Sequence, residues 1–338
     1  MGAEAPAPAR PEQWRLKPAY SVRTLVLLLA ASVLLAFSAH RTEIDRMLVL
    51  SGEAVATAAG QNESSQVLKG LGRIATDLFP LQFSETRETA RLENFDRDDL
   101  PPFSYLASQE TRESRLNSDT MAMEETTMAR EVLVQPVGYL GQAILLMLQT
   151  IEIAFWGTVL AVLLAVPLAI LGARNFTPHP AVYHASRTVC SFLRAMPELI
   201  SALFLVLAFG FGPIAGVLAL GLHTAGVLGK FFADDVENAD RGPQDALRST
   251  GANRLKVLGY AVFPQVLPSY LAYIQYILER NIRTATVIGI VGAGGIGQEL
   301  KGRFEMFNFS HVSTILLVIF ITVMTLEYLT GRLRGRLL

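Results

Sequence analysis

The sequence predicts an all-α membrane protein with six transmembrane helices, and three observations support this fold class. Of the 338 residues, 51% are hydrophobic, and the mean hydropathy is +0.35. Only 17% are charged, whereas soluble domains carry about 25%. Several uninterrupted apolar stretches approach the length of about 20 residues that a helix needs to cross a bilayer. This composition argues against an ordinary soluble enzyme and against a disordered chain. A net charge of −1 gives no reason to expect a nucleic-acid partner.

The first span is expected at residues 25–40, in the apolar run that follows a basic tail of residues 1–24. A cleaved signal peptide ending near Ala36 is the alternative. Residues 41–138 then form a polar insertion with 10 basic and 17 acidic residues between Arg41 and Val137. We expect a solvated insertion there, either without a role of its own or serving as a docking surface for another protein.

The remaining spans lie in residues 139–338. A lead-in helix over 139–150 is expected to lie at the membrane interface rather than to cross it. The breaker Gly210-Phe211-Gly212-Pro213 separates two spans that one apolar stretch would otherwise merge. The expected spans are Ile153–Ala173, 188–209, 214–230, Leu267–Ile288 and Phe309–Tyr328.

Orientation follows from the basic residues at both ends of the chain. An even number of spans puts both termini on one side, and the excess of Lys and Arg in both tails predicts that this side is the cytoplasm. The acidic insertion 41–138 is then extracytoplasmic. Counting the lead-in as a seventh span would place the two basic tails on opposite sides.

One cytoplasmic loop, residues 231–266, has an ordered pattern. Asp245-Ala246-Leu247 is followed after three residues by Gly251, and nine residues later by Ala261-Val262-Phe263-Pro264. Gly251 can end a short helix with a positive φ or allow a close backbone approach. Pro264 and Pro268 are expected to keep the next helix out of the loop. The alternative is an ordinary amphipathic loop with scattered glycine and proline.

This pattern resembles the EAA loop of ABC importer permeases, with Asp245 in place of the glutamate and Leu247 in place of the second alanine. The resemblance implies that Asp245, Ala246, Leu247, Gly251, Phe263 and Pro264 couple the spans to a separate ATP-hydrolysing subunit. The chain has no GxxxxGK[ST] phosphate loop. ATP and magnesium are therefore expected on the partner, with no catalytic residue and no cofactor on this chain.

The region 139–338 resembles phosphonate- and phosphite-type ABC importer permeases more narrowly. The matching stretches are residues 193–199, 216–226 and 279–297. The resemblance implies a type I importer fold, with a five-helix core plus an N-terminal helix, in a bacterial inner membrane. It also implies a homodimer, two cytoplasmic ATPase subunits, an extracytoplasmic substrate-binding protein, and import of a phosphorus oxyanion by alternating access.

Ionisable residues fall inside the expected spans, where they are costly and mark pairs or pathways. Arg194 and Glu198 are four residues apart, as are Glu279 and Arg283, so each couple can pair on one helix face. Arg280 lies three residues before Arg283, and His223 is expected to be a packed polar group. Two interpretations stay open. The charges form salt bridges that fix helix packing or link the fifth span to the third, or Arg280 or Arg283 lowers the barrier for a crossing anion.

The glycines Gly292, Gly294, Gly295 and Gly297 match GxGxxG, which also occurs in dinucleotide-binding folds. Because no strand–helix–strand pattern surrounds them, we expect a tight re-entrant turn instead. Cys190 is the chain's one cysteine, so neither a disulfide nor a cysteine-based metal site is expected.

Two other classes of protein are alternatives to an ABC permease for phosphorus oxyanions or for a different small solute. A secondary transporter driven by an ion gradient would show inverted repeats and interrupted helices in both halves. A membrane-bound enzyme would need a nucleophile–base pair or a metal cluster, and the five histidines are scattered along the chain.

Overall fold

The computed structural model describes residues 22–60, 65–91, 97, 100–116 and 123–337. The chain divides into two compact units, Met1–Thr76 and Asp77–Leu338. Most of the expected cytoplasmic tail, residues 1–21, lies outside the described residues.

The described part of the first unit consists of helices. Helix α1 covers Val22–Arg41, α2 covers Ile44–Ala58, and α3 begins at Gln66 and ends at Leu78, just inside the second unit. Helix α1 has no buried residue, and its length and apolar character are sufficient to cross a membrane. A helix that is hydrophobic all round is stable when lipid surrounds it.

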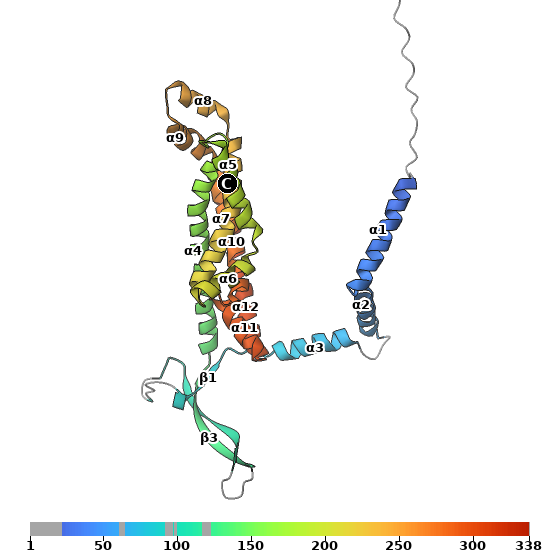
Figure 1. Ribbon diagram of the computed structural model, residues 1–338. Coiled ribbons are helices and arrows are strands. Elements are labelled where there is room, and N and C mark those ends of the chain that lie inside the picture. The colour runs from blue at the N-terminus through green and yellow to red at the C-terminus, as the bar shows by residue number, and fades with distance from the viewer. Residues whose placement is uncertain (1–21, 61–64, 92–96, 98–99, 117–122, 338) are drawn as a thin grey trace, which may run out of the picture. The chain divides into compact units, whose positions relative to one another are not determined.

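The second unit contains a bundle of helices (Figure 1). Its longer helices are α4 (Gly138–Leu171), α5 (Pro180–Ala195), α6 (Glu198–Phe209), α7 (Pro213–Asn238), α10 (Phe263–Gly289) and α12 (Phe309–Leu337). The shorter α11 (Ile296–Glu305) lies between α10 and α12 in the sequence.

Helices α4 and α7 pack closely because glycines face side chains across their contact. A Cβ on Gly157 would lie 2.9 Å from the Cβ of Leu220, and one on Gly221 would lie 2.6 Å from a methyl group of Leu160. Small residues let helix backbones approach in a membrane, where the packing itself drives association.

Within the described residues, five helices are long and apolar enough to cross a membrane, and a sixth crossing results if α5 and α6 count together. The expectation of one straight helix over 188–209 is wrong, because α5 and α6 meet at 89°. Met196 is extended and Pro197 precedes α6, and a proline disfavours helical conformation in the residue before it. The expected lead-in helix is the first part of α4, whose 34 residues extend about 50 Å.

The insertion contains a three-stranded antiparallel sheet, so a strictly all-α description is too narrow for this mostly helical chain. The strands are β1 (Glu85–Glu88), β2 (Tyr105–Leu116) and β3 (Met123–Gln135), in the order β1-β3-β2, with the short 3-10 turn η1 at Thr89–Arg91. The acidic composition did not indicate these strands.

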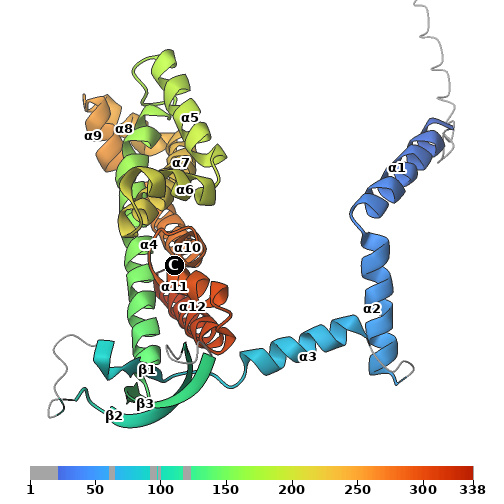
Figure 2. The same cartoon turned by 60° about the horizontal axis from the view of Figure 1, so that its bottom comes forward.

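The segment before β1 is attached to the ends of α4 and α12. The hydroxyl of Thr314 donates to the carbonyl of Gln82 at 2.7 Å, and the backbone N–H of Tyr139 donates to the carbonyl of Phe83 at 3.1 Å. The sheet therefore lies at one end of the bundle, whereas α8 (Arg241–Ser249) and α9 (Arg254–Val257) lie at the opposite end in both views (Figures 1 and 2).

Candidate coupling segment and membrane charge cluster

The loop expected to couple to an ATPase contains a short exposed helix. Helix α8 begins after Asp240, whose carboxylate accepts from the N–H of Gly242 at 3.1 Å as an N-cap. Asp245 and Ala246 are exposed, and Leu247 is partly exposed. The Asp245-Ala246-Leu247 triplet thus lies on a helix that leaves it accessible to another protein.

The turn after α8 depends on Gly251. Its φ is +82°, and its N–H donates to the carbonyl of Arg248 at 3.0 Å. A residue with a side chain is strained at this φ, although a Cβ at this position would meet nothing within 4 Å. Of the two roles expected for this glycine, the positive φ is therefore present, and the close backbone approach is not.

Beyond α9, a π-helical turn η2 (Leu258–Val262) leads into α10. Phe263 and Pro264 are exposed in the first turn of α10, where a proline needs no hydrogen-bond partner. Pro268 lies inside α10 and does not end a helix, contrary to the role expected for it.

Two polar side chains hold the base of α8 in place. Gln244 is buried and donates to the carbonyls of Ala239 and Asp240 at 3.1 and 3.0 Å. Gln265, in the first turn of α10, accepts from the N–H of Asp240 at 2.9 Å. These bonds connect α8 to the end of α7 and to the start of α10.

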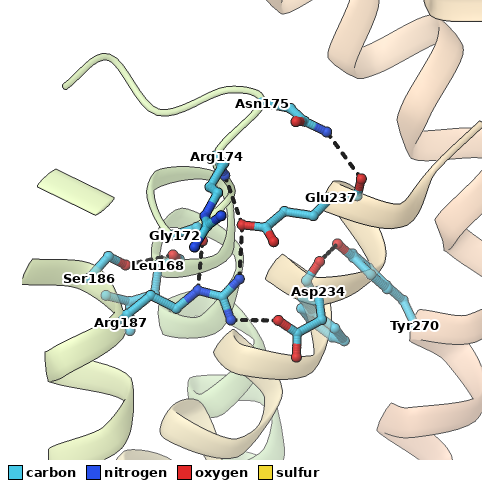
Figure 3. Close-up of polar contacts among 10 residues, drawn as sticks. Leu168, Gly172, Arg174, Asn175, Ser186, Arg187, Asp234, Glu237 and Tyr270 are labelled. Carbon is cyan, nitrogen blue, oxygen red and sulfur yellow. Dashed lines mark hydrogen bonds and ion pairs between the residues drawn. The ribbon is translucent and has the colours of Figure 1, made fainter. Parts of the chain in front are cut away.

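A network around Arg187 joins the same end of the bundle (Figure 3). The guanidinium of Arg187 contacts Asp234 at 2.5 Å and Glu237 at 3.1 Å, and donates to the carbonyl of Gly172 at 2.8 Å. Glu237 also accepts from the N–H of Arg174 at 2.9 Å. The Arg187 network therefore connects α5, the C-terminal end of α4 and the last turns of α7, a few residues before α8.

The bend between α5 and α6 carries a charge cluster that we call the Glu198 cluster. The carboxylate of Glu198 pairs with Arg280 of α10 and lies 3.1 Å from Nε2 of His223 in α7. Nδ1 of His223 lies 2.9 Å from the carbonyl of Met196. Because a carbonyl only accepts, this nitrogen carries a proton and donates. The cluster thus fixes the bend against α7 and α10.

The expected pair of Arg194 with Glu198 is wrong, because the break at Met196 and Pro197 interrupts the four-residue spacing. Glu279 and Arg283 do pair on α10, at 3.0 Å. Arg280 turns to Glu198 instead of sharing a partner with Arg283.

A buried polar triad also connects three helices. Asn281 of α10 donates to Thr158 of α4 at 3.0 Å and accepts from Thr224 of α7 at 3.3 Å. Neither this triad nor the Arg187 network was predicted from the sequence. Polar residues inside apolar stretches were a signal for the triad, but their partners lie 57 and 123 positions away.

The glycines of the GxGxxG match lie between α10 and α11. Gly292, Gly294 and Gly295 have φ values of +95°, +87° and +72°. Gly297 makes a close approach instead, because a Cβ on it would lie 2.0 Å from the carbonyl of Thr286. The hydroxyl of Thr150 accepts from the N–H of Ile296, the first residue of α11, at 2.8 Å. The glycines form a tight turn packed on α4 and α10, without the strand that a dinucleotide-binding turn follows.

The described part of the chain contains no group of three His, Cys, Asp or Glu side chains placed to hold a metal ion. Cys190 is a free, buried thiol.

A membrane-embedded helical bundle with an accessible helix at one end is the architecture of a transport permease. The family described as "Binding-protein-dependent transport system inner membrane component" matches residues 165–337, and this chain belongs to it. It is therefore a multi-pass inner-membrane permease of an ABC transporter, a system that also contains an ATPase and a binding protein.

Three relatives of this chain are also transport permeases. HtxE of Stutzerimonas stutzeri, named as a phosphite transport system permease, is 52% identical over 77% of this chain and all of its own length. PtxC of the same organism, also named as a phosphite transport permease, is 43% identical over 56% of this chain and 68% of its own. PhnE of Mycolicibacterium smegmatis, named as a phosphate-import permease, is 45% identical over 57% of this chain and 36% of its own.

A solved structure has a similar fold. It is an inward-facing MetNI methionine ABC transporter, matched with a TM-score of 0.50 and 18% identity over 57% of this chain and 94% of the matched chain. The bundle of the second unit therefore has the fold of ABC importer permeases.

Proposed function

We propose that this chain imports a phosphorus oxyanion of the phosphite or phosphonate type. The observation that carries this proposal is the identity of 52% with HtxE along the whole of that relative. The phosphate-import name of PhnE makes phosphate a further candidate of the same chemistry. The substrate is thus a small anion whose oxygens accept several hydrogen bonds.

Uptake into vesicles tests the substrate. The chain is reconstituted with its ATPase and binding protein, and uptake of labelled phosphite, methylphosphonate, phosphate and sulfate is compared with and without ATP. We expect ATP-dependent uptake of at least one phosphorus anion and none of sulfate. ATP-independent uptake driven by an ion gradient would instead indicate a secondary transporter and overturn the proposal.

We further propose that α8 docks on the ATPase and that Asp245, Ala246, Leu247, Gly251, Phe263 and Pro264 transmit its movement. Support comes from the exposure of α8 and from the hydrogen bonds that join its base to α7 and α10. ATP and magnesium would be bound by the partner.

A substitution at Gly251 tests this coupling. Gly251→Trp places a side chain at a φ of +82° and should reduce recovery of the ATPase in a pull-down roughly tenfold, the equivalent of about 1.4 kcal/mol. Gly242→Ala is the matched control, because its Cβ meets only Asp240 at ordinary contact distance. Unchanged recovery with Gly251→Trp would contradict the proposal.

In this arrangement two copies of the chain face each other, each supplying half of the pathway and one α8. The cytoplasmic parts are residues 1–24 and the C-terminal end. The first span covers residues 25–40, and the extracytoplasmic insertion covers 41–138. The transmembrane core covers 139–338 and includes the coupling loop 231–266. The opposite placement of α8 and the sheet supports these sides (Figure 1). Co-purification of two differently tagged copies tests the dimer.

The intramembrane charges have two roles in this proposal. The Glu198 cluster, with His223 and Arg280, holds the bend between α5 and α6, and Arg194 lies in the last turn of α5. Arg283, whose side chain is 45% exposed, is the accessible cation for a crossing anion, and Glu279 balances it. Full uptake by an Arg283→Gln variant that assembles normally would rule out that role. The glycine turn Gly292–Gly297 positions α11 against α10.

A further inference from the structure

Helix α3 has two chemically different faces, and neither is covered. Val67, Leu71, Ile74 and Leu78 follow at intervals of four, three and four residues, so they form one stripe along the helix. Lys69, Arg73 and Thr76 lie on the opposite face. Helix α3 has no buried residue.

The apolar stripe is too exposed for a helix in water. The side chains of Leu71 and Ile74 are 56% and 54% exposed, and Val67 is 36% exposed. Contiguous exposed apolar side chains mark an interaction surface. The stripe is aliphatic throughout, whereas protein interfaces are enriched in aromatic residues and arginine at their centres.

The chain itself restricts where the end of α3 can lie. Gln82 lies four positions after Leu78 and is bonded to Thr314 and Ser310 in the first turns of α12, a helix long and apolar enough to cross a membrane. A chain of four residues reaches at most about 14 Å. Leu78, the last residue of α3, is therefore near the first turns of α12. The ends of membrane-spanning helices lie at the level of the lipid headgroups.

We propose that α3 is an interfacial helix that lies in the membrane surface, with its Val67–Leu78 stripe in the acyl region. Lys69 and Arg73 then face the headgroup layer, where anionic phospholipids attract them. A helix with one apolar face, low overall hydrophobicity and basic residues on the polar face binds in this way. Its length of 13 residues is too short for a crossing.

Spin labels on the two faces test the proposal in the assembled transporter. Cys190, which is buried in α5, is replaced by alanine, and single cysteines are introduced at Leu71, Ile74, Lys69 and Arg73. The labelled permease, with its ATPase, is placed in vesicles of phosphatidylethanolamine and phosphatidylglycerol. Collision rates with oxygen and with a water-soluble nickel chelate are then measured.

We expect labels at positions 71 and 74 to collide more with oxygen than with nickel, and labels at 69 and 73 to show the reverse. Equal access to nickel at all four positions would overturn the proposal. So would protection of position 71 that appears only when the binding protein is added, or spin–spin broadening between two copies, because each would assign the stripe to a protein. Uptake by each labelled variant confirms that it has folded.

Discussion

Among single residues, Glu198 holds the bend between α5 and α6 against α7 and α10. Its carboxylate faces both Arg280 and His223, so Glu198→Gln leaves a partly buried arginine without its counter-charge. Removing one partner of a buried pair is more costly than removing both. We expect a loss of about 2 kcal/mol and a fall of roughly 5 °C in the melting temperature of the purified chain.

The double variant Glu198→Gln, Arg280→Gln serves as the control. Because it removes both charges, we expect it to melt above the single Glu198→Gln variant, with a coupling energy of about 0.5–3 kcal/mol. The single variants Glu198→Gln and Arg280→Gln are measured beside it. If their two losses of stability add up to the loss in the double variant, Glu198 and Arg280 do not interact, and the Glu198 cluster is not what holds the bend.

Single residues also show what the sequence could and could not predict of the site. The position of Gly251 after a short helix predicted a positive φ or a close backbone approach, and the structure has the positive φ. The pairing of Arg194 with Glu198 failed although Pro197 gave a signal that the helix would be interrupted. Arg187 and Asp234 are 47 positions apart, and helical spacing predicts contacts only between residues three or four positions apart.

Among the elements, the junction between α10 and α11 is the most sensitive to added volume. A Cβ on Gly297 would lie 2.0 Å from the carbonyl of Thr286 and 2.9 Å from Cα of Gly289. Both neighbours are backbone, so the two helices must move apart. Gly297→Ala should therefore lower stability by about 1–3 kcal/mol, measured as melting temperature and as the fraction that elutes as a single species.

Gly302 is the matched position in the same helix. A Cβ there would meet nothing within 4 Å, and alanine favours a helix over glycine by about 1 kcal/mol. Gly302→Ala should therefore be neutral or stabilising. If both alanine variants behaved alike, close packing of Gly297 would not be what holds α11 on α10.

The long helices were predictable for a physical reason. In lipid every backbone polar group must be bonded within its own segment, so an apolar stretch of sufficient length becomes a helix. That rule placed α1, α4, α7, α10 and α12. The rule does not apply outside the membrane. There, strand pairing such as that of Glu88 with Val132 depends on contacts between distant segments.

For the whole molecule, the placement of α8 and the sheet at opposite ends of the bundle makes the topology testable (Figure 2). Ser249 in α8 and Ser108 in β2 are both exposed. Each is changed to cysteine in a Cys190→Ala background, and intact cells with a permeable outer membrane are treated with a membrane-impermeant maleimide. Because charged reagents do not cross the bilayer, we expect Ser108→Cys to react at once and Ser249→Cys to react only after the inner membrane is opened.

The same experiment tests how many times the chain crosses the membrane between the two cysteines. Reaction of both cysteines in intact cells would mean that an even number of crossings lies between them, as would occur if the bent pair α5–α6 were re-entrant. Between Ser108 and Ser249 the chain contains α4, that bent pair and α7. Three crossings put the two sites on opposite sides, whereas two would put them on the same side. The labelling therefore decides whether the 89° bend interrupts a complete crossing, and with it whether α8 can reach a cytoplasmic ATPase.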